Sequence, residues 1–185
     1  MNMIDDRIIV SSNYREIDKL CNFILDSDIY LLGFDTEGMP VELIQFATDT
    51  HVYIFRIGES MRDYKYLPPS LLKLLSSRKI IKVGVDITQD NSRLKHDYNI
   101  SMSGIIDIQD IATTLKLPCK SLNDLSIKFT GIPKQKYHNL YDIKLRILFV
   151  QIYESYNISY LFKIYKSYNI SHLFNIIIKE IYFDK

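Results

Sequence analysis

The sequence predicts one α/β domain in which a mixed β-sheet carries helices on its faces. Three observations support this fold class. Three strand-type segments with short connections lie in the N-terminal third, strand-type and helix-type segments then alternate, and no low-complexity linker interrupts the 185 residues. A three-stranded antiparallel meander followed by alternating strands and helices is typical of a sheet with antiparallel and parallel parts. We therefore expect residues 1–185 to form a single domain.

The first half of the expected fold is a helix followed by three strands. After the polar segment 11–13, apolar residues recur every three or four positions, which predicts a helix that begins there. Three apolar segments with turn-rich connections then predict an antiparallel meander: residues 30–34, 41–47 and 51–55. The first of these strands leads directly into the acidic segment 35–37.

The second half is expected to alternate between helices and strands. Leucines after Pro68 and Pro69 predict a helix, and residues 80–85 and 104–108 predict two further strands, each followed by a helix. The helix after residues 80–85 is expected to have its N-cap at Asp86 or Thr88, and the next helix to cover residues 109–117. A capping box at Ser121 and Asp124 predicts the start of another helix. Two near-identical segments, 155–166 and 167–178, predict a helical extension over about residues 155–185.

Composition narrows the classes of protein that this chain can represent. The net charge is +1 and no run of about 18 apolar residues occurs, so we expect no membrane-spanning segment. Cys21 and Cys119 are too few for a disulfide framework, which favours an intracellular, reducing setting. Near-neutral charge also means that any contact with nucleic acid must come from local basic patches.

Two acids at a strand end are the first candidate for chemistry. Asp35 and Glu37 are two residues apart, so on an extended backbone both side chains leave from the same face. Carboxylates held together in this way repel each other unless a cation lies between them, and such oxygen ligands favour Mg²⁺ or Mn²⁺. From the spacing alone, an ordinary solvated pair of acids is the alternative interpretation.

Several blocks of sequence around and after these acids occur in an order that is typical of a known family. The blocks are residues 33–37 with 41–47 and 52–55, residues 82–90 with Leu94, and residues 106–112 followed by 121–125. Together they resemble the tyrosine branch of the DEDD superfamily of 3′-5′ exonucleases, the branch that contains ribonuclease D and the exonuclease domain of Werner-type helicases. The resemblance covers about residues 8–165 and implies a ribonuclease H-like fold.

The resemblance also implies a two-metal phosphodiesterase site that holds Mg²⁺ or Mn²⁺. Asp35 would bridge both ions, Glu37 and residue 157 would hold the ion that activates water, and Asp90 would hold the other ion. Tyr153 would orient the water. The fourth acid position is occupied by Asn157, which keeps a carbonyl oxygen but lacks the charge. We therefore expect an attenuated 3′-5′ exonuclease that acts on DNA or RNA with a 3′ end.

Three residues are alternative sources of the missing charge. Glu154 precedes Asn157 by one helical turn, and His138 with Asp142 resembles the pair found in the histidine branch, at a spacing of four instead of five residues. The alternative function is a catalytically inactive exonuclease-fold module that binds nucleic acid or a protein partner. A homo-oligomer formed through the C-terminal extension is a third possibility.

Nucleic-acid contacts would need cations for the phosphates and rings for stacking. The candidates are Lys79, Lys82, Arg93, Lys95, His96, Lys134, Lys136 and Tyr137, and the last three lie just before the helix that carries Tyr153. The alternative is that each group belongs to an ordinary solvated face.

Overall fold

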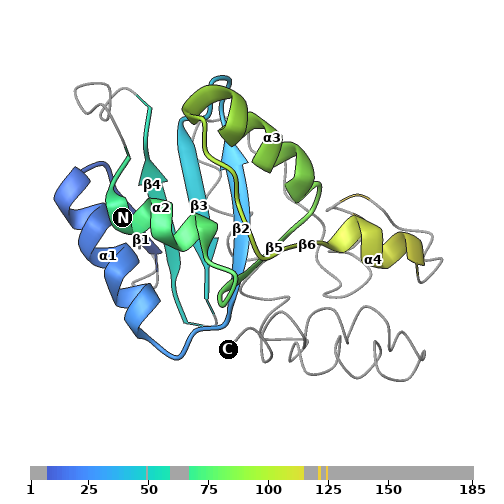
Figure 1. The fold of residues 1–185 in the computed structure, drawn as a ribbon, viewed down its shortest axis with the longest axis horizontal. Helices are drawn as coiled ribbons and strands as arrows, with labels where there is room; N and C mark the ends of the chain where they lie inside the picture. Colours follow the sequence, from blue (N-terminus) through green and yellow to red (C-terminus); the bar gives the residue numbers. More distant parts are fainter. Residues whose placement is uncertain (1–7, 49, 59–66, 115–120, 122–123, 125–185) are drawn as a thin grey trace, which may run out of the picture.

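A mixed β-sheet forms the centre of the fold in the computed structural model, which describes residues 8–48, 50–58, 67–114, 121 and 124 (Figure 1). Within these residues the sheet has six strands in the order β1-β4-β3-β2-β5-β6. The strands are β1 (Ile8–Ser11), β2 (Leu31–Glu37), β3 (Leu43–Ala47), β4 (Val52–Arg56), β5 (Ile81–Gly84) and β6 (Ile105–Asp107). The helices are α1 (Tyr14–Asp26), α2 (Pro69–Ser76), α3 (Ile87–Tyr98) and α4 (Ile108–Thr114).

The pairing of the strands confirms the expected mixed sheet. Strands β2, β3 and β4 form the antiparallel meander, while β5 pairs parallel to β2 and β6 pairs parallel to β5. Strand β1, which pairs parallel to β4 at the edge of the sheet, was not expected from the sequence. It is a short segment before a polar turn, and its β-branched residues Ile8, Ile9 and Val10 were the available signal.

The helices begin and end where local chemistry favours it. The side chain of Asn13 accepts a hydrogen bond from the backbone N–H of Glu16 at 3.1 Å, which caps α1. Pro69 occupies the first position of α2, where its missing N–H costs no hydrogen bond. At the expected capping box, Ser121 Oγ accepts from the backbone N–H of Asp124 at 3.1 Å. Among the described helices, none is long and apolar enough to cross a membrane.

The main core lies between one face of the sheet and helices α1, α2 and α3 (Figure 1). Phe34, Phe46 and Phe55 line this face on adjacent strands, with ring centroids 5.5 Å apart for the first pair and 5.9 Å for the second. The opposite face carries a smaller buried cluster of Ala47, Val52 and Ile54. Because side chains alternate along a strand, Thr36 lies on the same face as Phe34, whereas Asp35 and Glu37 lie on the opposite one.

Candidate active site

The acidic pair occupies the end of a strand that changes neighbours along its length. Strand β2 pairs with β3 as far as Glu37, but its pairing with β5 ends at Gly33 and Val83. Asp35 and Glu37 therefore lie beyond the last pairing with β5, near the carboxyl ends of two parallel strands. In open α/β sheets this is the usual position of ligand sites. Asp35 is half-buried and Glu37 is exposed.

The chain leaves β5 close to this end of β2. A Cβ atom added at Gly84 would lie 2.8 Å from the backbone oxygen of Phe34, so only glycine permits this approach. Asp86, at the N-cap position of α3, has a φ of 61° and its side chain makes no capping hydrogen bond. Its backbone N–H instead donates to Asp107 Oδ1 at 3.1 Å, which ties the turn to β6. The first turn of α3 carries Asp90.

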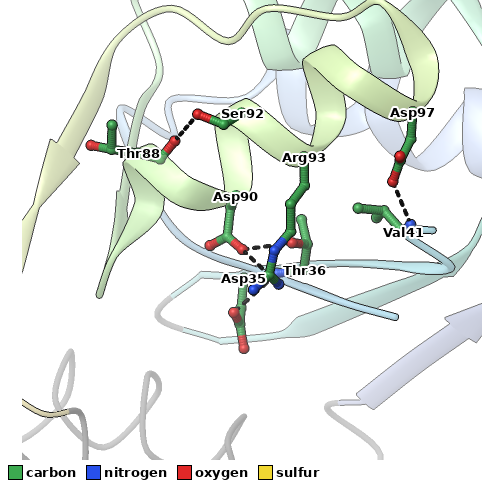
Figure 2. A network of polar contacts seen from close by, with 8 residues as sticks. All are labelled: Asp35, Thr36, Val41, Thr88, Asp90, Ser92, Arg93 and Asp97. Carbon is green, nitrogen blue, oxygen red and sulfur yellow. Dashed lines mark hydrogen bonds and ion pairs between the residues drawn. The ribbon is translucent and has the colours of Figure 1, made fainter. Parts of the chain in front are cut away.

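Asp90 and Asp35 each accept a hydrogen bond from Thr36 (Figure 2). The hydroxyl of Thr36 donates a buried hydrogen bond of 2.6 Å to Asp90 Oδ1, and its backbone N–H donates to Asp35 Oδ1 at 3.0 Å. Asp90 is only 6% exposed. The Nη1 atom of Arg93, one turn along α3, lies 3.9 Å from the same Asp90 Oδ1. Two carboxylates from elements far apart in sequence thus lie beside one threonine.

The surroundings of Asp90 are unfavourable for its negative charge. Burial raises the pKa of this carboxyl from 3.8 to about 6. The hydrogen bond from Thr36 and the charge of Arg93 lower the pKa, while the carboxylates of Asp86 and Glu37 raise it. A buried acid whose pKa is raised in this way would be stabilised in its charged form by an additional cation.

The far end of α3 holds the turn that follows Glu37. Asp97 Oδ2 accepts a hydrogen bond from the backbone N–H of Val41 at 2.8 Å, and the hydroxyl of Tyr98 donates to the backbone oxygen of Val41 (Figure 2 shows the first contact). The hydrogen bond with His96, and then the one from Val41, hold the pKa of Asp97 below its usual value. Helix α3 is therefore attached to the β2–β3 region at both of its ends.

The comparisons with known proteins assign the chain to a family. A model of the 3′-5′ exonuclease family matches residues 8–167. The chain belongs to this family. It is 27% identical over 128 residues to a 3′-5′ exonuclease of Arabidopsis thaliana, across 57% of this chain and 42% of that protein. It is 30% identical over 127 residues to the human exonuclease 3′-5′ domain-containing protein 2, across 63% of this chain and 20% of that protein. It thus matches less than half the length of these relatives.

Solved structures support the fold of this chain. The crystal structure of the EXD2 exonuclease domain soaked in Mg matches with a TM-score of 0.54 and 22% identity, over 96% of this chain and 99% of that one. The form soaked in Mn matches with a TM-score of 0.53 and 22% identity, over 88% and 95% of the two chains. At this identity the similarity establishes the ribonuclease H-like fold, and the metals are properties of those crystals.

The acids near the end of β2 fit a hard divalent cation by their donor chemistry, since carboxylate oxygens are the ligands that Mg²⁺ and Mn²⁺ prefer. Asp35 and Asp90 both accept hydrogen bonds from Thr36, and Asp90 experiences the charge of Glu37. Within the described ranges, however, no three His, Cys, Asp or Glu side chains are arranged as a ready metal site. The described residues alone therefore do not form a complete site of this kind.

One predicted nucleic-acid contact is wrong. Lys82 is fully buried within β5, and its ammonium group donates to three backbone carbonyl oxygens, so it does not face a ligand. Arg93 is half-buried beside Asp90, while Lys79, Lys95 and His96 are exposed.

The remaining predicted site residues lie outside the described part of the chain. They are Lys134, Lys136, Tyr137, His138, Asp142, Tyr153, Glu154 and Asn157, together with the extension at about 155–185. Two residues that sequence reasoning missed are Thr36 and Asp97, whose contacts join α3 to β2 and to the turn after it. The position of Thr36 between two acids was the available signal for the first.

Proposed function

We propose that this chain is a metal-dependent 3′-5′ exonuclease of the tyrosine branch that hydrolyses terminal phosphodiester bonds of DNA or RNA inside cells. The observation that carries the proposal is that Asp35 and Asp90 both accept hydrogen bonds from Thr36, near the end of β2. These acids come from separate sequence blocks, they share Thr36 as a hydrogen-bond donor, and they occupy the positions to which the family resemblance assigns metal ligands. Membership of the 3′-5′ exonuclease family supports the same reaction.

In this proposal Asp35, Glu37 and Asp90 hold Mg²⁺ or Mn²⁺ through their carboxylate oxygens. The bound ions would supply charge stabilisation to the phosphate and lower the pKa of the attacking water. Arg93 is the described cation closest to Asp90, and it is available to a phosphate once another cation neutralises that acid. Lys134, Lys136 and Tyr137 would contact the strand that ends in the site.

Asn157, four residues after Tyr153 in the sequence, would attenuate the activity. With three carboxylates in place of four, we expect the loss of about 3–4 kcal/mol of charge stabilisation, which corresponds to turnover slower by about 10²- to 10³-fold. Glu154, or His138 with Asp142, would be alternative sources of charge. An Asn157→Asp variant should therefore gain activity unless one of these residues already compensates.

Degradation of a 5′-labelled single-stranded oligonucleotide with Mn²⁺ tests the proposal, with DNA and RNA versions run in parallel. We expect stepwise shortening from the 3′ end by the native protein, loss of shortening in Asp35→Ala, and faster shortening in Asn157→Asp. Asp28→Ala is the matched control, because Asp28 is an exposed acid before β2 and outside the proposed site. Its activity should equal that of the native protein.

The neutral side chain at position 157 favours one competing function. In that case the chain is an inactive exonuclease-fold module that binds nucleic acid or a protein partner, or that self-associates through its C-terminal extension. Cleavage by Asn157→Asp alone would identify a silenced enzyme with intact metal ligands. Absence of cleavage in every variant would contradict the exonuclease proposal.

A further inference from the structure

We propose that Thr36 is the positioning residue of the metal site, which sets the orientation of two carboxylates that belong to different elements. The inference rests on the proposed function and deepens it. Thr36 is 3% exposed and lies on the face of β2 opposite to Asp35 and Glu37, so it does not join them as a ligand. Its contacts, however, reach both Asp35 and Asp90.

The contacts of Asp90 show what Thr36 fixes. The hydrogen bond from Thr36 and the ion pair with Arg93 both fall on Oδ1. Within the described part of the chain, Oδ2 has no hydrogen bond or ion pair. A carboxylate held at one oxygen by a neutral donor presents the other oxygen in a defined direction, which is how an outer hydrogen bond orients a metal ligand. Thr36 therefore determines which oxygen of Asp90 is available to a cation.

The same residue constrains Asp35 through its backbone. The Thr36 N–H donates to Asp35 Oδ1 at 3.0 Å, and this donor is fixed because residue 36 is part of the β2–β3 ladder. The β-branched side chain of Thr36 has few rotamers, so its hydroxyl is also held in one place. One residue thus couples the carboxylate of a strand to that of a helix.

The contacts at the C-terminal end of α3 make it possible to distinguish a positioning role of Thr36 from a role in folding. Asp97 and Tyr98 bind the backbone of Val41 independently of Thr36. Loss of the Thr36 hydroxyl should therefore leave α3 in place while it releases the carboxylate of Asp90. A purely structural role predicts the opposite, namely lower stability with unchanged metal affinity.

The test measures Mn²⁺ affinity of the full chain without nucleic acid, from the electron paramagnetic resonance signal of free Mn²⁺. We expect Thr36→Val to weaken Mn²⁺ binding by about 10- to 100-fold. Thr36→Ser, which retains the hydroxyl, should stay within about threefold of the native protein. Thr48→Val is the matched control, because Thr48 is a buried threonine, 2% exposed, whose hydroxyl donates to His51 O at the opposite end of β3. Its Mn²⁺ affinity should not change.

A double-mutant cycle identifies the route of the effect. If Thr36 acts through Asp90, Thr36→Val should cause no further loss in an Asp90→Asn background. The inference would be overturned if Thr36→Val bound Mn²⁺ with native affinity, or if it lowered the affinity as much in the Asp90→Asn background as in the native protein. It would also be overturned if Thr36→Ser bound Mn²⁺ as weakly as Thr36→Val. Should Thr36→Val fail to fold by far-UV circular dichroism, Thr36→Cys replaces it, since a thiol is a weak donor of similar size.

The outcomes also separate this inference from the proposed function. Native protein that binds Mn²⁺ in a Thr36-dependent way but does not shorten oligonucleotides would refute the exonuclease activity alone. Native protein that shortens oligonucleotides while Thr36→Val binds Mn²⁺ normally would refute the positioning role alone. Absence of Mn²⁺ binding by the native protein would overturn the positioning role together with the metal site.

Discussion

The buried Lys82 gives a prediction that depends only on the described fold. Its side chain is 0% exposed, and its ammonium group donates to the backbone oxygens of Ser77 at 2.6 Å, Ile80 at 2.8 Å and Leu74 at 3.3 Å. These carbonyls lie at the end of α2 and in the connection to β5. Burial lowers the pKa of Lys82 from 10.5 to about 8. Replacement by methionine keeps the length of the side chain and removes the titrating group.

The lowered pKa makes stability depend on pH with a definite sign. Between about pH 8 and 10.5 the unfolded chain keeps its proton on Lys82 while the folded chain loses it, so the free energy of unfolding rises with pH. The full effect is about 3 kcal/mol at 1.36 kcal/mol per pKa unit, and about 1 kcal/mol of it falls between pH 7 and 9. Burial also raises the pKa of Cys21, which lowers stability above about pH 9, but this contribution is common to both proteins and cancels in the difference.

Urea-induced unfolding, followed by far-UV circular dichroism at pH 7, 8 and 9, measures this difference, because the chain contains no tryptophan for fluorescence. The free energy of unfolding of the native protein minus that of Lys82→Met should grow by about 1 kcal/mol from pH 7 to 9. The exposed Lys79 provides the control, since the difference for Lys79→Met should stay constant. A constant difference for Lys82→Met would refute the reasoning, because it would mean that the three carbonyls fully offset the burial of the ammonium group.

Three further predictions concern the N-cap of α1, the close approach of Gly84 to β2, and Arg93 beside Asp90. Asn13→Ala should lower the free energy of unfolding by about 1 kcal/mol in urea, through loss of the α1 cap, and an unchanged value would contradict that role. Gly84→Ala should cost about 1–3 kcal/mol in the same assay, because the added Cβ meets Phe34 O at 2.8 Å, and native stability would show that β5 shifts freely. Arg93→Gln should tighten Mn²⁺ binding up to about fivefold, because it removes a cation beside Asp90, whereas weaker binding would contradict this competition.

Local patterns in the sequence were sufficient for most of the described fold and for the shared face of Asp35 and Glu37, whereas Asp90 was a candidate only through the family resemblance. Alternation along a strand placed Asp35 and Glu37 on one face, and the helix pattern after β5 placed Asp90 near its start. These are short-range signals, with periods of two and 3.6 residues, that remain readable without knowledge of tertiary contacts. The antiparallel meander followed from the same alternation and from short connections between strands.

Long-range contacts explain what the sequence did not reveal. Lys82 looked like a surface cation, because nothing near it in sequence shows that carbonyls at the end of α2 converge on its strand position. Thr36 was not singled out from the sequence, because its partner Asp90 is 54 residues away. Strand β1 was missed because a four-residue edge strand has too few residues to show alternation, and its only described strand partner is β4.

The most direct test of the central claim is the Mn²⁺-dependent shortening of a 5′-labelled single-stranded oligonucleotide by the native protein and by Asp90→Asn. The account predicts a ladder of products shortened from the 3′ end by the native protein, and loss of this ladder in Asp90→Asn while its far-UV circular dichroism spectrum stays native. An undiminished ladder from Asp90→Asn would contradict the claim that the acid held by Thr36 belongs to the metal site.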